Sequence, residues 1–295
     1  MHLVFSILMD NYISVIVTAY NRKGFLMAAL KSTVKQTLDR RFYEIIVVKN
    51  FTDAEIDSYI EENGIKNIVM EGTIGKFMDA AIMESHGNII SFLDDDDMFT
   101  SDKIKVLVEK FKNNNLCYFH NGATRFRDNI KKPLHRHAFE VDFNMSCISI
   151  RKDVLIIYRN QLRQISTAQD TFLYLIALES GRKIENGREL LTFYRQHGNN
   201  TSGFDHIEWL NIYIDNLNNF KLIFKSKKCI KQLAALISIA KFALYRNNGN
   251  THMPKFHEWI QFSYYSIRRL HARLFFGVLK TLLTGKVNKI VSKEK

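Results

Sequence analysis

Four consecutive aspartates, Asp94–Asp97, are the side chains of this sequence that point most clearly to chemistry. Adjacent carboxylates repel one another, so their pKa values rise unless a cation is present. Hard divalent cations such as Mg²⁺ and Mn²⁺ prefer carboxylate oxygen and often bind one or two such groups together with substrate phosphates. A solvated acidic loop is the plain alternative. Because the run follows an apolar segment that reads as a buried strand, Ile89–Leu93, we favour a ligand site.

Strands and helices alternate regularly up to this acidic run. Strands are expected at Ile13–Thr18, Glu44–Val48, Asn67–Met70 and Ile89–Leu93, with helices at Phe25–Thr37, Asp53–Asn63 and Lys76–Ser85. This pattern predicts an α/β fold with a mostly parallel sheet that is covered by helices on both faces. Ligands of such sheets bind at the carboxyl ends of the strands. The segments Thr18–Arg22, Lys49–Asp53 and Asp94–Asp97 should therefore converge on one crevice.

The order and spacing of these segments resemble those of family 2 glycosyltransferases, which have the Rossmann-like GT-A fold. The resemblance rests on Ile13–Arg22 with its Tyr-Asn end, on Glu44–Val48 and on Gly87–Asp97 with its Phe-Leu-Asp-x-Asp-Asp ending. It extends from residue 13 to about residue 203. It implies an inverting, hexosyl-transferring enzyme that uses a nucleotide-diphosphate-sugar as donor.

By this resemblance, the acidic run is the D-x-D element that holds the metal and the ribose and diphosphate of the donor. Asp96 is the expected direct ligand of Mn²⁺ or Mg²⁺, Asp94 is its partner near ribose and metal, and Asp95 is a substitute for Asp94. The cation would offset the charge that develops on the β-phosphate as the bond to the sugar breaks. In the string Phe193–Ser202, His197 is expected to reach the metal or the diphosphate, and Arg195 to neutralise phosphate.

An acidic residue that opens a helix deprotonates the acceptor hydroxyl in this family, and Asp170 matches that position. Inverting transfer needs one base on the face opposite the leaving group, and an ionised carboxylate within hydrogen-bond reach can serve. The alternative is that Asp170 only caps the helix expected over Thr171–Ser180, as aspartate often does. With the acidic run in place, we favour the catalytic role.

The ends of the first two strands match the family less evenly. Thr18, Tyr20 and Asn21 stand where the base and ribose of the donor lie. Asn50 occupies the position of an aspartate that contacts the nucleobase, and since an amide can both donate and accept, the identity of the base stays open. Lys49 adds a cation that contacts phosphate or is only solvated.

Positive charge is concentrated in the last third of the chain. The 295 residues carry a net charge of +12, and the segment after residue 204 has sixteen Lys and Arg against five Asp and Glu. Such asymmetry indicates that one part faces a polyanion or an anionic membrane. We expect a catalytic domain over residues 1–204 and a basic helical region over residues 205–295.

Within that region, apolar and basic residues alternate at helical spacing over Trp259–Leu283. A basic amphipathic helix can lie in a membrane interface, or it can pack on the catalytic domain with its basic face in water. Nucleic-acid binding is disfavoured, since no signature of a nucleic-acid module is present. Three widely spaced cysteines and an N-terminus without a basic region, Met1–Met9, indicate a reducing compartment and no secretory signal.

Two classes of function therefore compete. The first is a metal-dependent glycosyltransferase in the cytoplasm, peripheral on the inner face of the cell membrane, that acts on a glycan or lipid-linked acceptor. The second is a non-catalytic protein with the same fold whose basic tail binds an anionic membrane or partner. The combination of Asp94–Asp97, Asp170 and His197 favours the enzyme, because a binding protein does not need all three.

Overall fold

The computed structural model describes residues 11–127, 130–133, 144–195 and 207–248. The chain divides into two compact units, one of Met1–His135 and Phe143–His197, the other of Arg136–Asp142 and Gly198–Lys295. The domain boundary expected after residue 204 and the basic helix expected over Trp259–Leu283 both lie outside the described residues. They stay predictions.

The strands described in the first unit form one sheet. They are β1 (Ile13–Ala19), β2 (Tyr43–Lys49), β3 (Lys66–Val69), β4 (Ile89–Asp94), β5 (Met98–Phe99), β6 (Leu116–Arg127), β7 (Ile130–Pro133), β8 (Ile148–Arg151) and β9 (Lys183–Arg195). Their order is β3-β2-β1-β4-β8-β6-β9-β5, and β7 pairs with β6. The first four strands are parallel, as the alternation of strands and helices predicted. Antiparallel pairing of β8 with β4 and β6 makes the sheet as a whole mixed.

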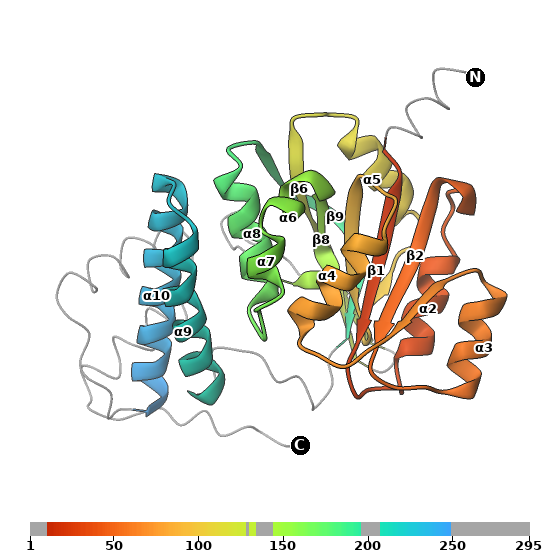
Figure 1. Ribbon diagram of the computed structural model, residues 1–295, viewed down its shortest axis with the longest axis horizontal. Coiled ribbons are helices and arrows are strands. Elements are labelled where there is room, and N and C mark those ends of the chain that lie inside the picture. The colour runs from red at the N-terminus through yellow and green to blue at the C-terminus, as the bar shows by residue number, and fades with distance from the viewer. Residues whose placement is uncertain (1–10, 128–129, 134–143, 196–206, 249–295) are drawn as a thin grey trace. The chain divides into compact units, whose positions relative to one another are not determined.

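Helices cover the sheet in two layers. They are α2 (Leu26–Val34), α3 (Ala54–Glu62), α4 (Ile74–Glu84), α5 (Lys103–Phe111), α6 (Lys152–Ile157), α7 (Arg159–Leu162) and α8 (Gln169–Glu179). Apolar side chains of α2, α3 and α5 share one core with alternate residues of β1 and β2. In Figure 1, α4 lies in front of β1, and it packs on β1 and β2, while α6 and α8 pack on β8.

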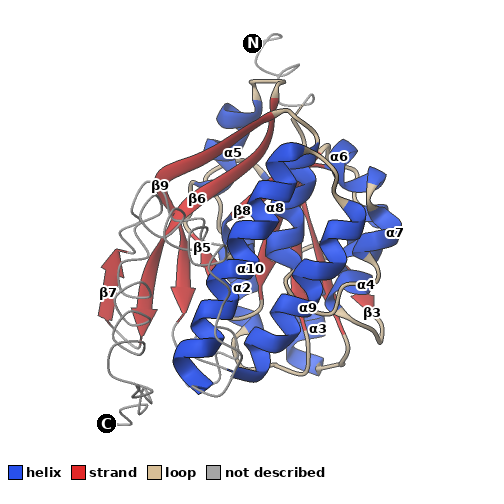
Figure 2. Ribbon diagram, turned by 90° about the vertical axis from the view of Figure 1, so that its left-hand side faces the viewer, coloured by secondary structure: helices blue, strands red, loops and turns tan. Residues whose placement is uncertain are grey.

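The burial of β1 agrees with the parallel part of the prediction. Every residue of β1 is buried, as expected for a central strand with helices on both faces of the sheet. The rest of the sheet differs from the sequence expectation. The sequence pattern predicts two short strands, Cys117–His120 and Ala123–Arg127, where the structure has one long strand, β6, with register irregularities on either side of Gly122. It runs parallel to the long strand β9, as Figure 2 shows. The strand expected over Met145–Ile150 splits into a short 3-10 turn, Met145–Cys147, followed by β8.

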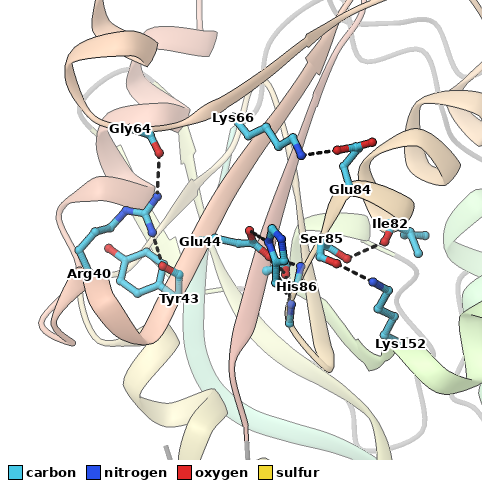
Figure 3. Close-up of polar contacts among 12 residues, drawn as sticks. Arg40, Tyr43, Glu44, Gly64, Lys66, Ile82, Glu84, Ser85, His86 and Lys152 are labelled. Atoms are coloured by element: carbon cyan, nitrogen blue, oxygen red, sulfur yellow. Dashed lines mark hydrogen bonds and ion pairs between the residues drawn. The ribbon is translucent and has the colours of Figure 1, made fainter. Parts of the chain in front are cut away.

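A partly buried polar cluster fixes the loop that leads into β4. Glu44 accepts hydrogen bonds from Ser14 Oγ (2.5 Å) and from the backbone N–H of Gly87 (3.3 Å), and its other oxygen lies 2.9 Å from His86 Nδ1 (Figure 3). A Cβ on Gly87 would lie 2.6 Å from the backbone nitrogen of Ser14. This cluster holds the amino ends of β1, β2 and β4 together. It thereby sets where the opposite ends of these strands meet.

The second unit contains two described helices, α9 (Ile207–Ile223) and α10 (Lys227–Asn248), which pack side by side (Figure 1). The sequence pattern predicted helix throughout residues 207–245, and a short break between the two helices divides it. The inward face of α9 carries a stripe of buried residues, namely Leu210, Tyr213, Leu217 and Phe220. Within the described residues, no helix is both long enough and apolar enough to cross a bilayer.

Candidate active site

The carboxyl ends of three parallel strands meet at one place, which confirms the predicted convergence. Thr18, the buried sixth residue of β1, is in register with Val48 of β2 and with Asp94 of β4. The loops that follow these strands are joined by side chains. Arg22 pairs with Asp95, and with Asp96 at 3.0 Å. The roles assigned to the individual residues stay predictions.

Asn21 and Asn50 bond to each other by two hydrogen bonds. The backbone N–H of Asn21 donates to Asn50 Oδ1 (2.9 Å), and Asn50 Nδ2 donates to Asn21 Oδ1 (2.7 Å). Asn21 adopts the left-handed backbone conformation (φ 55°), which asparagine tolerates better than most residues. Asn50 thus braces the end of β1, and Tyr20 beside it is 53% exposed with its ring 6.0 Å from that of Phe77. Tyr20 therefore offers an open aromatic face at the strand ends.

A tight turn separates the four aspartates into two groups. The N–H of Asp97 donates to the carbonyl of Asp94 (3.2 Å), which closes the turn. Asp95 is buried and pairs with Arg22. One carboxylate oxygen from each of Asp94, Asp96 and Asp97 lies within 4.8 Å of the others. This spacing is what a shared divalent cation requires of its oxygen ligands.

Asp97 is the member of this group to which the sequence assigned no separate role. Its side chain is buried, its Oδ1 accepts from the backbone N–H of Arg195 (2.9 Å), and its Oδ2 has no hydrogen-bond partner among the described residues. Burial, followed by the charge of Asp96, raises the pKa of Asp97 to about 7. A buried carboxylate oxygen without a partner is costly, and a cation at this point would satisfy it.

Asp170 faces the acidic turn from α8. It lies in the first turn of that helix, after Ala168, whose backbone is left-handed (φ 62°) and whose side chain cannot cap the helix. Burial and the surrounding carboxylates, Asp170 among them, raise the pKa of Asp94 well above its usual range. Asp170 is not the N-cap residue, but it accepts a hydrogen bond from the N–H of Thr171 (2.6 Å), so a structural role in the first turn of the helix retains support.

Arg195 lies against the acidic turn as well. Its Nε donates to the carbonyl of Asp96 (2.9 Å), and its guanidinium lies 4.4 Å from the ring centres of both Phe25 and Phe126. Stacking between two rings fixes the planar cation at the end of β9. This places positive charge beside the predicted metal ligands. His197, two residues further on, lies outside the described residues.

The prediction that Lys49 contacts phosphate or is solvated receives no support. The side chain is fully buried, and its ammonium lies 2.8 Å from Asp57 and donates to the carbonyl of Phe51 (2.7 Å). A solvated Lys49 is therefore wrong. The ammonium is used to tie the end of β2 to α3, because a buried cation must find partners nearby.

A second buried lysine, Lys103, escaped the sequence analysis. Its ammonium donates to the carbonyl of Ser146 (2.6 Å) and to Thr192 Oγ1 (3.2 Å), while Ser146 Oγ accepts from the N–H of Asp94 (3.0 Å). Burial lowers the pKa of Lys103 to about 7. Through Ser146, these contacts fix the backbone of the acidic turn at Asp94. No sequence signal marks them, because a lysine near the start of an amphipathic helix normally lies in water.

Fold and site together define a glycosyltransferase-like protein with acidic side chains at the strand ends, and the comparisons with known proteins agree. The family model described as glycosyl transferase family 2 matches residues 14–173. The chain belongs to this family, as the resemblance of its motifs implied. That match includes the acidic turn and Asp170.

Solved structures confirm the fold. TarS from S. aureus aligns with a TM-score of 0.60 and 18% identity over 93% of this chain and 92% of that one. TarS in complex with UDP-GlcNAc aligns with a TM-score of 0.61 and 15% identity over the same shares. The mannosyltransferase PcManGT from Pyrobaculum calidifontis, in complex with GDP-Man and Mn²⁺, aligns with a TM-score of 0.56 and 11% identity over 93% and 88% of the two chains. The mixed sheet flanked by helices is therefore the GT-A fold.

The sequence relatives match smaller parts of the two chains than the solved structures do. An uncharacterized glycosyltransferase of Rickettsia conorii is 29% identical over 131 residues, which are 41% of this chain and 21% of the relative, so the match spans about a fifth of that protein. The Escherichia coli protein WfaP, a UDP-Glc:α-D-GlcNAc-diphosphoundecaprenol β-1,3-glucosyltransferase, is 25% identical over 201 residues, covering 64% of this chain and 79% of WfaP.

Proposed function

We propose that this chain transfers a hexose, with inversion, from a nucleotide-diphosphate-sugar to an acceptor hydroxyl. The observation that carries the proposal is the acidic turn, in which oxygens of Asp94, Asp96 and Asp97 lie within 4.8 Å of one another with Asp170 facing them. The family supplies the reaction type. The structures of relatives with UDP-GlcNAc and with GDP-Man support a nucleotide-sugar donor and leave its base open.

The carboxylate oxygens of Asp94, Asp96 and Asp97 fit Mn²⁺ or Mg²⁺. All three side chains offer hard oxygen, and the unpartnered Oδ2 of Asp97 fits a ligand that the described protein groups do not provide. The cation, when bound, would offset charge on the departing diphosphate. The PcManGT complex with GDP-Man and Mn²⁺ supports this choice. Asp95 is committed to Arg22, which weakens the prediction that it substitutes for Asp94.

Side chains of this protein have the remaining roles in the proposed reaction. Asp170 accepts the proton of the acceptor hydroxyl, and the fixed guanidinium of Arg195 stabilises negative charge on the diphosphate. Thr18, Tyr20, Asn21 and Asn50 lie at the strand ends, where the nucleoside would rest. With both polar atoms of its amide bonded to Asn21, Asn50 contacts the base only if that pair opens.

We place the reaction in the cytoplasm, at the inner face of the cell membrane, with a lipid-linked or other glycan acceptor. The acceptor named for WfaP is a sugar diphosphate on undecaprenol, and the basic composition of the region after residue 204 supports an anionic surface.

The test replaces Asp170 by Asn and measures nucleoside diphosphate release with UDP-, GDP- and dTDP-sugars and a polyprenyl-diphosphate-sugar acceptor. We expect transfer to fall at least a hundredfold, roughly the contribution of a general base, while metal-dependent donor binding by thermal shift persists. Glu55→Gln, which removes an exposed carboxylate from the first turn of α3, should leave transfer unchanged.

Two results would contradict the proposal. If Asp170→Asn lowers only the melting temperature and keeps full transfer, Asp170 has only a structural role in the first turn of the helix. If the folded wild-type chain binds no donor with any metal, the non-catalytic alternative is correct.

A further inference from the structure

The turn between α9 and α10 carries a concentrated positive surface, which we call the basic turn, residues 221–231. Its five lysines are all exposed, namely Lys221, Lys225, Lys227, Lys228 and Lys231. Two large aliphatic side chains are exposed among them, Leu222 at 75% and Ile230 at 51%. The described residues 216–248 contain no Asp or Glu, so nothing within them offsets this charge.

Helix stability accounts for Lys221 and Lys225, which lie at the C-terminus of α9, but not for the lysines of α10. The N-terminus of a helix carries a partial positive charge and favours acidic side chains. The first turn of α10 nevertheless has Lys227 and Lys228 and no acidic residue. Lys227, Lys228 and Lys231 form no ion pair with any residue that the structure describes. Lys227 and Lys228 are therefore placed against the local electrostatic preference, which points to an anionic partner.

The basic turn is nevertheless well formed. Phe224 and Cys229 are buried within it, Phe220 and Phe224 pack edge to face with ring centres 6.4 Å apart, and the N–H of Cys229 donates to Ser226 Oγ (3.2 Å). The exposed side chains are therefore presented from a packed helical hairpin.

We propose that the basic turn docks on an anionic membrane surface, with Leu222 and Ile230 entering the interface and the lysines binding lipid phosphates. A soluble polyanion would leave these aliphatic side chains in water, whereas a membrane interface buries them and lets the long lysine side chains reach the headgroups. The proposal deepens the membrane placement given above and rests on it for its biological role. It uses residues other than those of Trp259–Leu283.

The test measures sedimentation of the full chain with vesicles of phosphatidylcholine alone or mixed with phosphatidylglycerol, without donor or acceptor. We expect binding to the mixed vesicles only, weakened by salt. Replacing Lys227, Lys228 and Lys231 by Gln should weaken binding about a hundredfold, from about fivefold for each lysine near the surface. The matched control replaces Lys35, Lys76 and Lys105, exposed lysines of the first unit, and should change binding little.

Leu222→Ser distinguishes a membrane from a soluble polyanion. We expect it to weaken vesicle binding several-fold and to leave heparin binding unchanged. Equal vesicle binding by the wild type and by the three-lysine variant would overturn the proposal, and so would a Leu222→Ser variant that binds vesicles as the wild type does. Unchanged melting temperatures would show that the variants are folded. Because the assay involves no transfer, its failure would leave the proposed reaction intact.

Discussion

Replacing Asp97 by Asn should stabilise the metal-free protein. The Asp97 side chain is buried, and burial raises its pKa from an ordinary 3.8 to about 7. At 1.36 kcal/mol for each pH unit, ionising this carboxyl in the fold costs about 4 kcal/mol above pH 7. Asn has nearly the same volume, and its Oδ1 can still accept the N–H of Arg195. Asp97 is thus expected to serve function although it destabilises the metal-free fold.

The sign of the pH dependence follows from the raised pKa. The folded state binds the Asp97 proton more tightly than the unfolded state, so the contribution of Asp97 to wild-type stability is highest below about pH 4 and declines until about pH 7. The advantage of Asp97→Asn should be near zero at pH 4 and reach its plateau above pH 7. Lys103, whose own pKa burial lowers to about 7, loses a negative neighbour in the variant, which reduces the gain. We therefore expect about 1–3 kcal/mol at pH 8.

The assay is thermal unfolding in EDTA from pH 4 to pH 9, compared with Asp102→Asn, which removes an exposed carboxylate of the neighbouring segment. A gain of this size raises the melting temperature by about 2–10 °C for a domain of roughly 200 residues. Mn²⁺ should then stabilise the wild type and not the Asp97→Asn variant. A variant that is less stable than the wild type at pH 8, or a difference independent of pH, would refute the reasoning.

Two further substitutions test the site and the fold. Arg22→Gln releases a carboxylate of the acidic turn from its guanidinium, and we expect Mn²⁺ affinity by calorimetry to rise up to about tenfold, with exposed Arg41→Gln as control. Unchanged affinity would mean that Arg22 does not compete with the cation. Gly75→Ala places a Cβ 2.0 Å from the carbonyl oxygen of Leu162 and should lower the free energy of unfolding by about 1–3 kcal/mol or more. The control Gly24→Ala, which has open space around its Cβ, should be near neutral. Equal melting temperatures of the two variants would contradict this expectation.

The parallel half of the fold was predictable because its inner strands β1, β2 and β4 are mostly apolar and buried, whereas the edge strand β3 is largely exposed. Once Ile13–Thr18 and Ile89–Leu93 are read as buried strands, the meeting of their carboxyl ends follows from topology. The mixed half of the sheet was less predictable. There the first part of β9 is a mixture of exposed and partly buried residues, so the sequence pattern indicates a strand only at its apolar end, Leu190–Tyr194.

The site was predictable as a set of segments and less so as a set of contacts. A run of four aspartates predicts a cation, but the turn that separates Asp95 from its neighbours depends on a backbone hydrogen bond without a sequence signature. Lys49 and Lys103 show the same limit, because lysine is rarely buried and composition gives no reason to expect either one inside. Their partners come from elements distant in sequence.

The charges around the acidic turn suggest why donor and metal should bind together. Among the described residues, five carboxylates gather there, Asp94–Asp97 and Asp170, against the guanidinium groups of Arg22 and Arg195 and the buried amine of Lys103, whose pKa burial lowers to about 7. Burial, and after it the surplus of neighbouring carboxylates, raises the pKa of Asp94 and of Asp97. A donor diphosphate would add negative charge to this surplus, and only a divalent cation removes the conflict. The nucleotide-sugar should therefore bind weakly without the metal. Bound metal should raise its affinity by more than the contact between metal and diphosphate would alone.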